Sequence, residues 1–159
     1  IWNYQQISLG FNYRMTDIQA ALGISQMERL DDFVTKRQAI AKRYNKTLTG
    51  LALVTPYQLS DSYSSCHLYV IRIKLEETQQ TQRMVYDALQ SAGINVNLHY
   101  IPVYRQPYYE SLGFEAGYCL EAEKYHREAL SIPIYPSLIM SQQDHVIDSI
   151  KFVLVGKSL

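Results

Sequence analysis

Apolar residues recur at helical spacing through the first third of the chain, between Thr16 and Thr49. They form a one-sided stripe: Ile18, Leu22, Leu30, Phe33, Val34, Ala41, Tyr44 and Leu48. A straight helix of that length would run ~50 Å, longer than the ~40 Å breadth of a domain whose radius of gyration is ~15 Å. We therefore expect a kink between Leu30 and Asp32, with Asp31 and Asp32 capping a second segment. The free end is expected to pack on something outside this domain.

Short strands and helices are predicted after Gly50, which ends the helical region. Strands are expected over 51–56, 66–75 and 94–99, with a helix over 82–92. One face of the second strand carries Tyr69, Ile71, Ile73 and Leu75. The inward positions of the helix are Met84, Val85, Ala88, Leu89 and Ala92.

The last third of the chain continues this alternation. A helix over 118–130 offers four residues for burial: Leu120, Ala122, Ala129 and Leu130. A short buried strand follows over 131–135, and Ser141 with Asp144 is expected to cap the final helix. That helix turns inward Val146, Ile147, Ile150, Val153 and Leu154. The pattern favours an α/β fold: a three- to four-stranded sheet, mixed or antiparallel, covered on one side by helices, with the region from Thr16 to Thr49 along its edge.

Composition and charge narrow the function classes. The 159 residues suit one domain, and 47% of them are hydrophobic, enough for a core. Fifteen basic residues balance fifteen acidic ones, which argues against nucleic acid or an anionic membrane as a partner reached by long-range attraction. Cys66 and Cys119 are lone thiols, as in a reduced, cytoplasmic protein. The first residue, Ile1, is no initiator methionine and indicates an internal cut.

A polar loop meets a strong helix start near residue 16. Thr16 and Gln19 have the spacing of a capping box, which places Asn12 and Arg14 just outside a helix N-terminus. Free backbone N–H groups, an amide and a guanidinium together favour a phosphate or a carboxylate. The alternative is a turn-forming asparagine followed by a solvated charge.

A second group of polar residues lies on the strand over 94–99. Ile94, Val96 and Leu98 share one face, which puts Asn95, Asn97 and His99 on the other. An ordinary exposed sheet face explains the two asparagines better than a cleft does.

His99 differs because it opens the loop over 99–109, which holds five aromatic or imidazole rings and two prolines. Such rings suit the wall of a sugar or nucleotide pocket, and they suit the edge of a core equally well. The four histidines lack the spacing of metal ligands: His67, His99, His126 and His145. The sequence also has no glycine-rich phosphate loop and no evident catalytic triad.

Three ordered blocks of the chain resemble one enzyme family. The blocks are Leu9 to Gly23, continuing to Gln26 and Arg29-Leu30-Asp31; His99 to Tyr104 with Pro107-Tyr108-Tyr109; and Leu130 to Pro136. In this order they resemble the sugar-nucleotide aminotransferases of the DegT/StrS group, over about residues 8 to 155. Three further segments resemble the branch that aminates a UDP-linked 4-keto-6-deoxy sugar on the route to pseudaminic acid: Trp2 to Gln6, Ser8 to Arg14 and Cys66 to Tyr69.

The resemblance implies a fold-type I enzyme that carries pyridoxal phosphate (PLP) on a lysine of a larger N-terminal domain. Residues 1–15 are then a linker from that domain, and 16–159 are the C-terminal small domain. None of the seven lysines stands in a setting that would activate an amine, so we expect no catalytic lysine here and no activity of the chain alone.

The resemblance also implies ligand roles and partners. In the family the asparagine matching Asn12 reaches the cofactor phosphate of a partner subunit, and Arg14 would add charge at the same anion. His99 and Tyr100 become candidates for contact with the nucleotide-sugar. The implied partners are a UDP-linked keto-sugar, glutamate as amino donor and a second copy of the chain in a homodimer. A free-standing binding or regulatory module stays the alternative.

Overall fold

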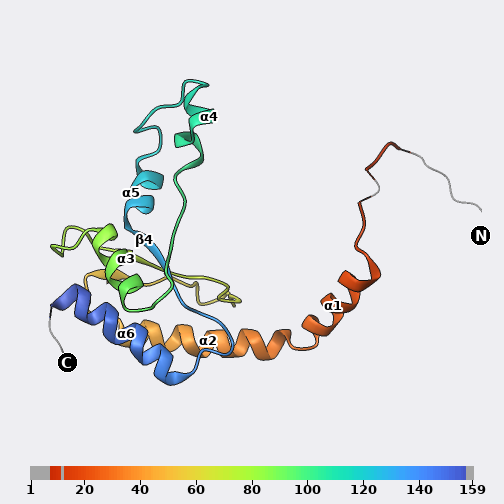
Figure 1. The fold of residues 1–159 in the computed structure, drawn as a ribbon, viewed down its shortest axis with the longest axis horizontal. Coiled ribbons are helices and arrows are strands. Elements are labelled where there is room, and N and C mark those ends of the chain that lie inside the picture. The colour runs from red at the N-terminus through yellow and green to blue at the C-terminus, as the bar shows by residue number, and fades with distance from the viewer. Residues whose placement is uncertain (1–7, 12, 157–159) are drawn as a thin grey trace, which may run out of the picture.

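The computed structural model describes residues 8–11 and 13–156, and its centre is an antiparallel sheet of four strands (Figure 1). The strands are β1 (Leu53–Val54), β2 (Tyr69–Ile73), β3 (Asn97–Leu98) and β4 (Ala129–Ile132), in the order β1-β2-β4-β3. In the central pair Tyr69 lies opposite Ile132 and Arg72 opposite Ala129. The predicted α/β class with a small sheet is confirmed, and the sheet is antiparallel.

Three helices pack on one face of this sheet and form the core with it. They are α2 (Leu30–Thr47), α3 (Gln82–Ser91) and α6 (Met140–Val155). The strands contribute Tyr69, Ile71, Ile73, Leu130 and Ile132 to the core, and the helices contribute Tyr44, Val85, Leu89, Val146, Ile147 and Ile150. Most predicted inward positions are therefore confirmed. Met84 and Leu120 are errors, since their side chains are 49% and 71% exposed.

The long helical region breaks earlier than its sequence predicts. Helix α1 (Asp17–Met27) begins with the predicted capping box at Thr16, and α2 begins after Arg29, ahead of the expected kink. Asp31 and Asp32 lie inside the first turn of α2 rather than capping it. Carboxylates in a first turn also stabilise a helix through its dipole, which explains why an acidic pair there marks the helix start without being its cap.

Helix α1 leaves the body of the molecule and extends away from it (Figure 1). None of its residues is buried, and its apolar side chains are mostly exposed: Ile18 84%, Leu22 63%, Ile24 65% and Met27 66%. An apolar surface of this kind is typical of an interface.

We therefore expect the isolated 159-residue chain to self-associate through α1, because association removes this apolar surface from water. Sedimentation velocity over a concentration series measures the effect, and a chain carrying Ile18→Lys and Leu22→Lys should sediment as a monomer. A parent chain that is monomeric at every concentration would contradict this prediction.

Two boundaries in the second half of the chain differ from expectation. Ala129 and Leu130 do not end helix α5 (Leu120–Glu128) but open β4, where Leu130 lies opposite Ile71. Pairing with two neighbouring strands outweighs the helical pattern there. Helix α6 follows Ile139, whose N–H donates to Gln142 Oε1, so the predicted cap at Ser141 is wrong.

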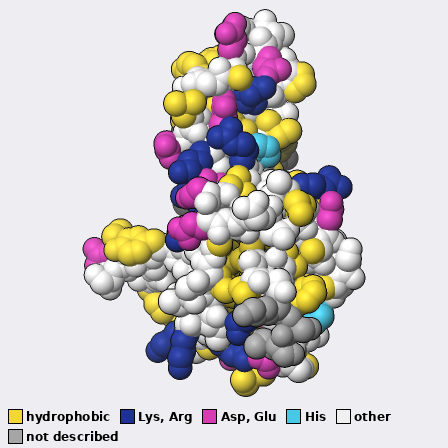
Figure 2. All heavy atoms as spheres, turned by 90° about the vertical axis from the view of Figure 1, so that its left-hand side faces the viewer, with side chains coloured by type: hydrophobic (Ala, Val, Ile, Leu, Met, Phe, Trp, Pro, Cys, Tyr) yellow, Lys and Arg dark blue, Asp and Glu magenta, His cyan; other side chains and the backbone are white. Residues whose placement is uncertain are grey.

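Residues 99–128 form a projection that rises from one edge of the sheet (Figure 1). It contains the short helices η1 (Val103–Arg105) and α4 (Pro107–Glu110) and returns through α5. Figure 2 shows charged and hydrophobic side chains mixed on its surface. Within residues 8–11 and 13–156, no helix has the length and apolar character needed to cross a membrane.

Candidate functional site

The residues singled out from the sequence lie in two separate regions. Arg14 precedes α1, whereas His99 and Tyr100 follow β3 at the base of the projection. Figure 1 shows the segment before α1 far from the projection. Asn12 lies outside the described residues. The chain therefore does not bring Arg14 together with His99 and Tyr100 in one site.

The first region is the corner before α1. A shallow concavity there is lined by four exposed residues: Tyr13, Arg14, Met15 and Gln19. The capping box is closed: Gln19 N–H donates to Thr16 Oγ1 at 3.3 Å, and Thr16 N–H donates to Gln19 Oε1 at 2.9 Å. The helix dipole and Arg14 favour an anion at this corner, while the carboxylate of Asp17 in the first turn offsets part of that charge.

The second region centres on His99. Its ring is half-buried and meets Tyr100 and Tyr125 edge-on, at centroid distances of 6.0 Å and 6.4 Å. Nε2 is shielded from solvent and has no hydrogen-bond partner in the described part of the chain. Burial lowers the pKa of His99 below its ordinary value, which favours the neutral ring at pH 7. Its unpartnered nitrogen has one unused hydrogen-bonding position, which a ligand reaches only if the side chain turns outward.

Tyr100 and the two asparagines complete this end of the sheet. Tyr100 is 84% exposed, so its hydroxyl is available to a partner. Asn97 is exposed on β3, in line with the exposed-face interpretation, whereas Asn95 precedes the strand and lines a cavity with Tyr135 and His145. Leu98 is 44% exposed, unlike Ile94 and Val96, because β3 is a two-residue edge strand at the limit of the core.

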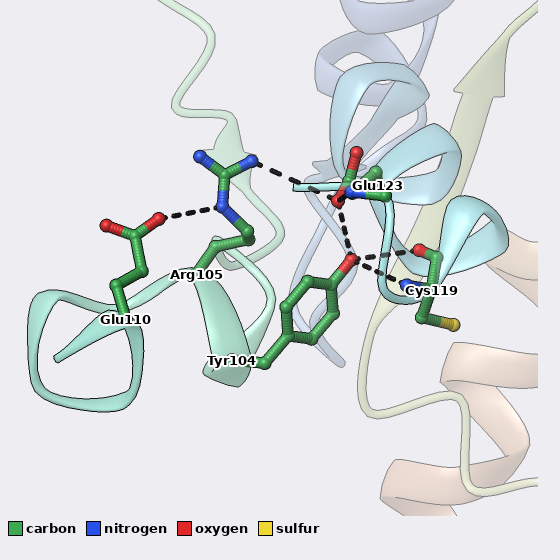
Figure 3. A network of polar contacts seen from close by, with 6 residues as sticks. Tyr104, Arg105, Glu110, Cys119 and Glu123 are labelled. Carbon is green, nitrogen blue, oxygen red and sulfur yellow. Dashed lines mark hydrogen bonds and ion pairs between the residues drawn. The ribbon is translucent and has the colours of Figure 1, made fainter. Parts of the chain in front are cut away.

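A polar network that the sequence did not indicate holds the projection together (Figure 3). The Tyr104 hydroxyl oxygen lies 2.8 Å from Glu123 Oε1 and 2.9 Å from the carbonyl oxygen of Cys119. Gly117 N–H donates to the same Glu123 oxygen at 2.7 Å, and Arg105 Nη1 lies 3.9 Å from it. The Gly117 N–H, helped by the Tyr104 hydroxyl, lowers the pKa of Glu123. These partners are distant in sequence, so no local pattern identifies them.

The lowered pKa of His99 has a consequence for stability. The unfolded chain binds a proton at His99 more readily than the folded chain does, so folding stability should decrease as the pH falls from the ordinary pKa of about 6.5 toward the lower folded pKa. Above 6.5 this contribution is constant.

Urea unfolding from about pH 5 to about pH 8 measures this dependence. In a His99→Gln chain, the decrease in folding stability that comes from His99 at acidic pH should be absent. An unchanged pH profile in that variant would show that His99 is not the group responsible.

Comparison with known proteins gives these regions a context. The fold is one found in solved aminotransferases: Spr1654 from Streptococcus pneumoniae, in its PLP-form, superposes with a TM-score of 0.85 at 28% identity over 98% of this chain and 40% of that one. The chain belongs to the DegT/DnrJ/EryC1/StrS aminotransferase family, whose model matches residues 2–151.

Two curated relatives show the same partial coverage. The spore coat polysaccharide biosynthesis protein SpsC of Bacillus subtilis is 34% identical over 98% of this chain and 41% of its own length. The UDP-4-amino-4,6-dideoxy-N-acetyl-beta-L-altrosamine transaminase of Campylobacter jejuni is 32% identical over 97% of this chain and 41% of its own length. The chain thus spans about two fifths of these relatives, and its family membership favours the aminotransferase over a free-standing module.

Proposed function

We propose that the chain is the C-terminal portion of a PLP-dependent aminotransferase that aminates a nucleotide-linked 4-keto-6-deoxy sugar, with glutamate as donor. The observation that carries the proposal is the similarity of nearly the whole chain to the Campylobacter jejuni transaminase. The similarity to SpsC supports a place in surface polysaccharide or glycan synthesis. We place this synthesis in the cytoplasm as part of the proposal. We further propose that this amino transfer serves pseudaminic acid synthesis.

The described residues fit only the phosphate end of PLP. Arg14 and the N-terminal end of α1 suit an anion, and we assign Asn12 to the same phosphate. No described lysine is buried, and several pair with carboxylates, such as Lys36 with Asp32 at 2.7 Å. We therefore assign the Schiff-base lysine to the larger N-terminal domain. When bound, PLP supplies the electron withdrawal that amino transfer needs.

We assign the substrate to the second region. The exposed Tyr100 would contact the nucleotide-sugar, and the shielded His99 Nε2 would bond to it once the ring turns outward. The distance between this region and Arg14 supports a homodimer, because one subunit can then give Arg14 to its partner's cofactor while it uses His99 for its own substrate. In this arrangement the linker 1–15 serves the cofactor site of the partner subunit, and the small domain 16–159 contacts the substrate of its own subunit.

The full-length parent protein tests the proposal directly. Incubated with PLP, a UDP-linked 4-keto-6-deoxy sugar and ¹⁵N-glutamate, it should yield an amino sugar that carries the ¹⁵N label, detected by mass spectrometry. A parent protein that binds the nucleotide-sugar but transfers no label from glutamate or another amino acid would contradict the proposed reaction.

The isolated 159-residue chain should neither transaminate nor trap PLP covalently. A lysine forms a stable adduct at one position only where its amine is activated by desolvation or a neighbouring cation, and the described lysines are exposed or half-exposed. Incubation with PLP, borohydride reduction and peptide mapping should show scattered, substoichiometric labelling. A stoichiometric adduct on a single lysine would overturn this expectation.

A further inference from the structure

We propose that His126 is a positioning residue for the nucleotide-sugar: it fixes the main chain at His99 and so sets where the His99 and Tyr100 side chains meet the substrate. This inference rests on the proposed function. His126 lies on α5, and its Nδ1 is 2.8 Å from the carbonyl oxygen of His99. A carbonyl oxygen only accepts hydrogen bonds, so Nδ1 carries the proton in this contact.

The contact is needed because β3 ends before His99. The strand pairs with β4 only through Asn97 and Leu98, and the chain then leaves the sheet into the projection. The His126 hydrogen bond holds the next carbonyl, one residue beyond the last paired position. Without it, nothing in the ladder would fix the orientation of His99.

Helix α5 is itself held from two sides, so it can act as a support. Gln82 on α3 donates from Nε2 to the carbonyl oxygens of His126 and Ala129, both at 2.8 Å. Arg72 on β2 donates from Nε and Nη2 to Glu128 Oε2 at 3.0 Å and 2.6 Å, and the Glu128 side chain is only 7% exposed. A charge-assisted pair whose carboxylate is almost fully buried makes a rigid attachment.

Tyr125, next to His126, supplies a second contact to the same ring. The Arg72 guanidinium lies 5.8 Å from the Tyr125 ring centroid, and that ring meets His99 edge-on. The His99 side chain is thus bounded by Tyr125 while its backbone is held by His126. Nε2 is the ring atom left without a partner, and it is shielded, so it meets a ligand only when the ring turns outward.

Steady-state kinetics on the full-length parent enzyme tests the role of His126. His126→Ala should raise the KM for the nucleotide-sugar about 3- to 10-fold, the effect of one hydrogen bond, with little change in kcat or in the KM for glutamate. His126→Asn keeps an N–H donor at a similar position and should restore the KM to near its original value. His126→Leu keeps side-chain bulk without the donor and replaces the Ala variant if that one fails to fold.

His145→Ala is the matched control. His145 Nε2 lies 2.8 Å from the carbonyl oxygen of Ala92, so this variant removes the same kind of hydrogen bond elsewhere in the domain. It should lower Tm about as much as His126→Ala does and leave the KM for the nucleotide-sugar unchanged. Equal KM effects in both variants would reduce His126 to a general structural role.

His99→Ala separates the inference from the proposed function. If His99→Ala leaves the KM for the nucleotide-sugar unchanged, the proposed substrate contact is wrong and the role of His126 falls with it. If His99→Ala raises that KM while His126→Ala and His126→Leu do not, the substrate contact stands and the positioning role of His126 is overturned.

Discussion

Replacing Tyr44 by Ala is expected to destabilise the chain by about 3–5 kcal/mol, as for other large aromatic residues deleted from a packed core. Tyr44 on α2 is fully buried, and its ring centroid lies 5.0 Å from that of Tyr69 on β2. Its hydroxyl donates to the carbonyl oxygen of Pro133 at 3.0 Å. The substitution thus removes a contact between helix and sheet, opens a cavity and leaves a carbonyl unpaired.

Urea unfolding of the 159-residue chain measures the loss, as a lower midpoint at an unchanged slope. Tyr44→Phe is the control because it keeps the ring and removes only the hydroxyl, which should cost about 1–3 kcal/mol. Equal losses in the two variants would show that the hydrogen bond, and not packing, holds α2 on the sheet.

Local signals in the sequence predicted much of this fold. The capping box at Thr16 is confirmed, and so are the buried positions Val85 and Leu89 on α3. Each depends on spacing within one or two turns of a helix, which the chain displays directly. The apolar character of Met84 predicts an inward position, but its side chain lies on the exposed side of α3, next to the buried Val85. A flexible apolar side chain at the edge of a stripe carries little information on burial.

Tertiary pairing decided the features that the sequence did not predict. Ala129 and Leu130 fit a helix by period, yet they form β4 because β2 and β3 both pair with that strand. The contact between His126 and the His99 carbonyl joins residues 27 apart, and Tyr104 meets Glu123 across 19 residues. Contacts of this range depend on how the projection returns to the sheet, which no local pattern encodes.

In each of the two candidate regions, the sequence predicts some features and only the structure shows the others. The family resemblance makes His99 and Tyr100 candidates at the start of a ring-rich loop, and the structure adds an unpartnered Nε2 on the half-buried ring of His99. Arg14 was selected as part of a loop before a capped helix, and that helix extends away from the body with its apolar side chains exposed (Figure 1). An arm of this kind suits a role in a neighbouring subunit better than a role at its own sheet.

Replacing Asn12 by Ala in the full-length parent enzyme is expected to weaken PLP binding roughly 10- to 150-fold, the equivalent of about 1.5–3 kcal/mol for a lost hydrogen bond to a charged group. The reason is the proposed donation from the Asn12 amide to the cofactor phosphate of the partner subunit, beside Arg14 and the start of α1. Titration of the apoenzyme with PLP, followed by absorbance, measures the affinity. The Tm of the small domain should barely change, because Asn12 precedes every helix and strand.

Asn95→Ala is the matched control, since it removes the same kind of side-chain amide from an exposed position between α3 and β3. It should leave the affinity for PLP unchanged. Arg14→Ala should weaken PLP binding in the same direction as Asn12→Ala, because both would act on one phosphate. Unaltered affinity in the Asn12→Ala enzyme would remove Asn12 from the cofactor site, and a loss in the Arg14→Ala enzyme alone would assign the phosphate to the guanidinium.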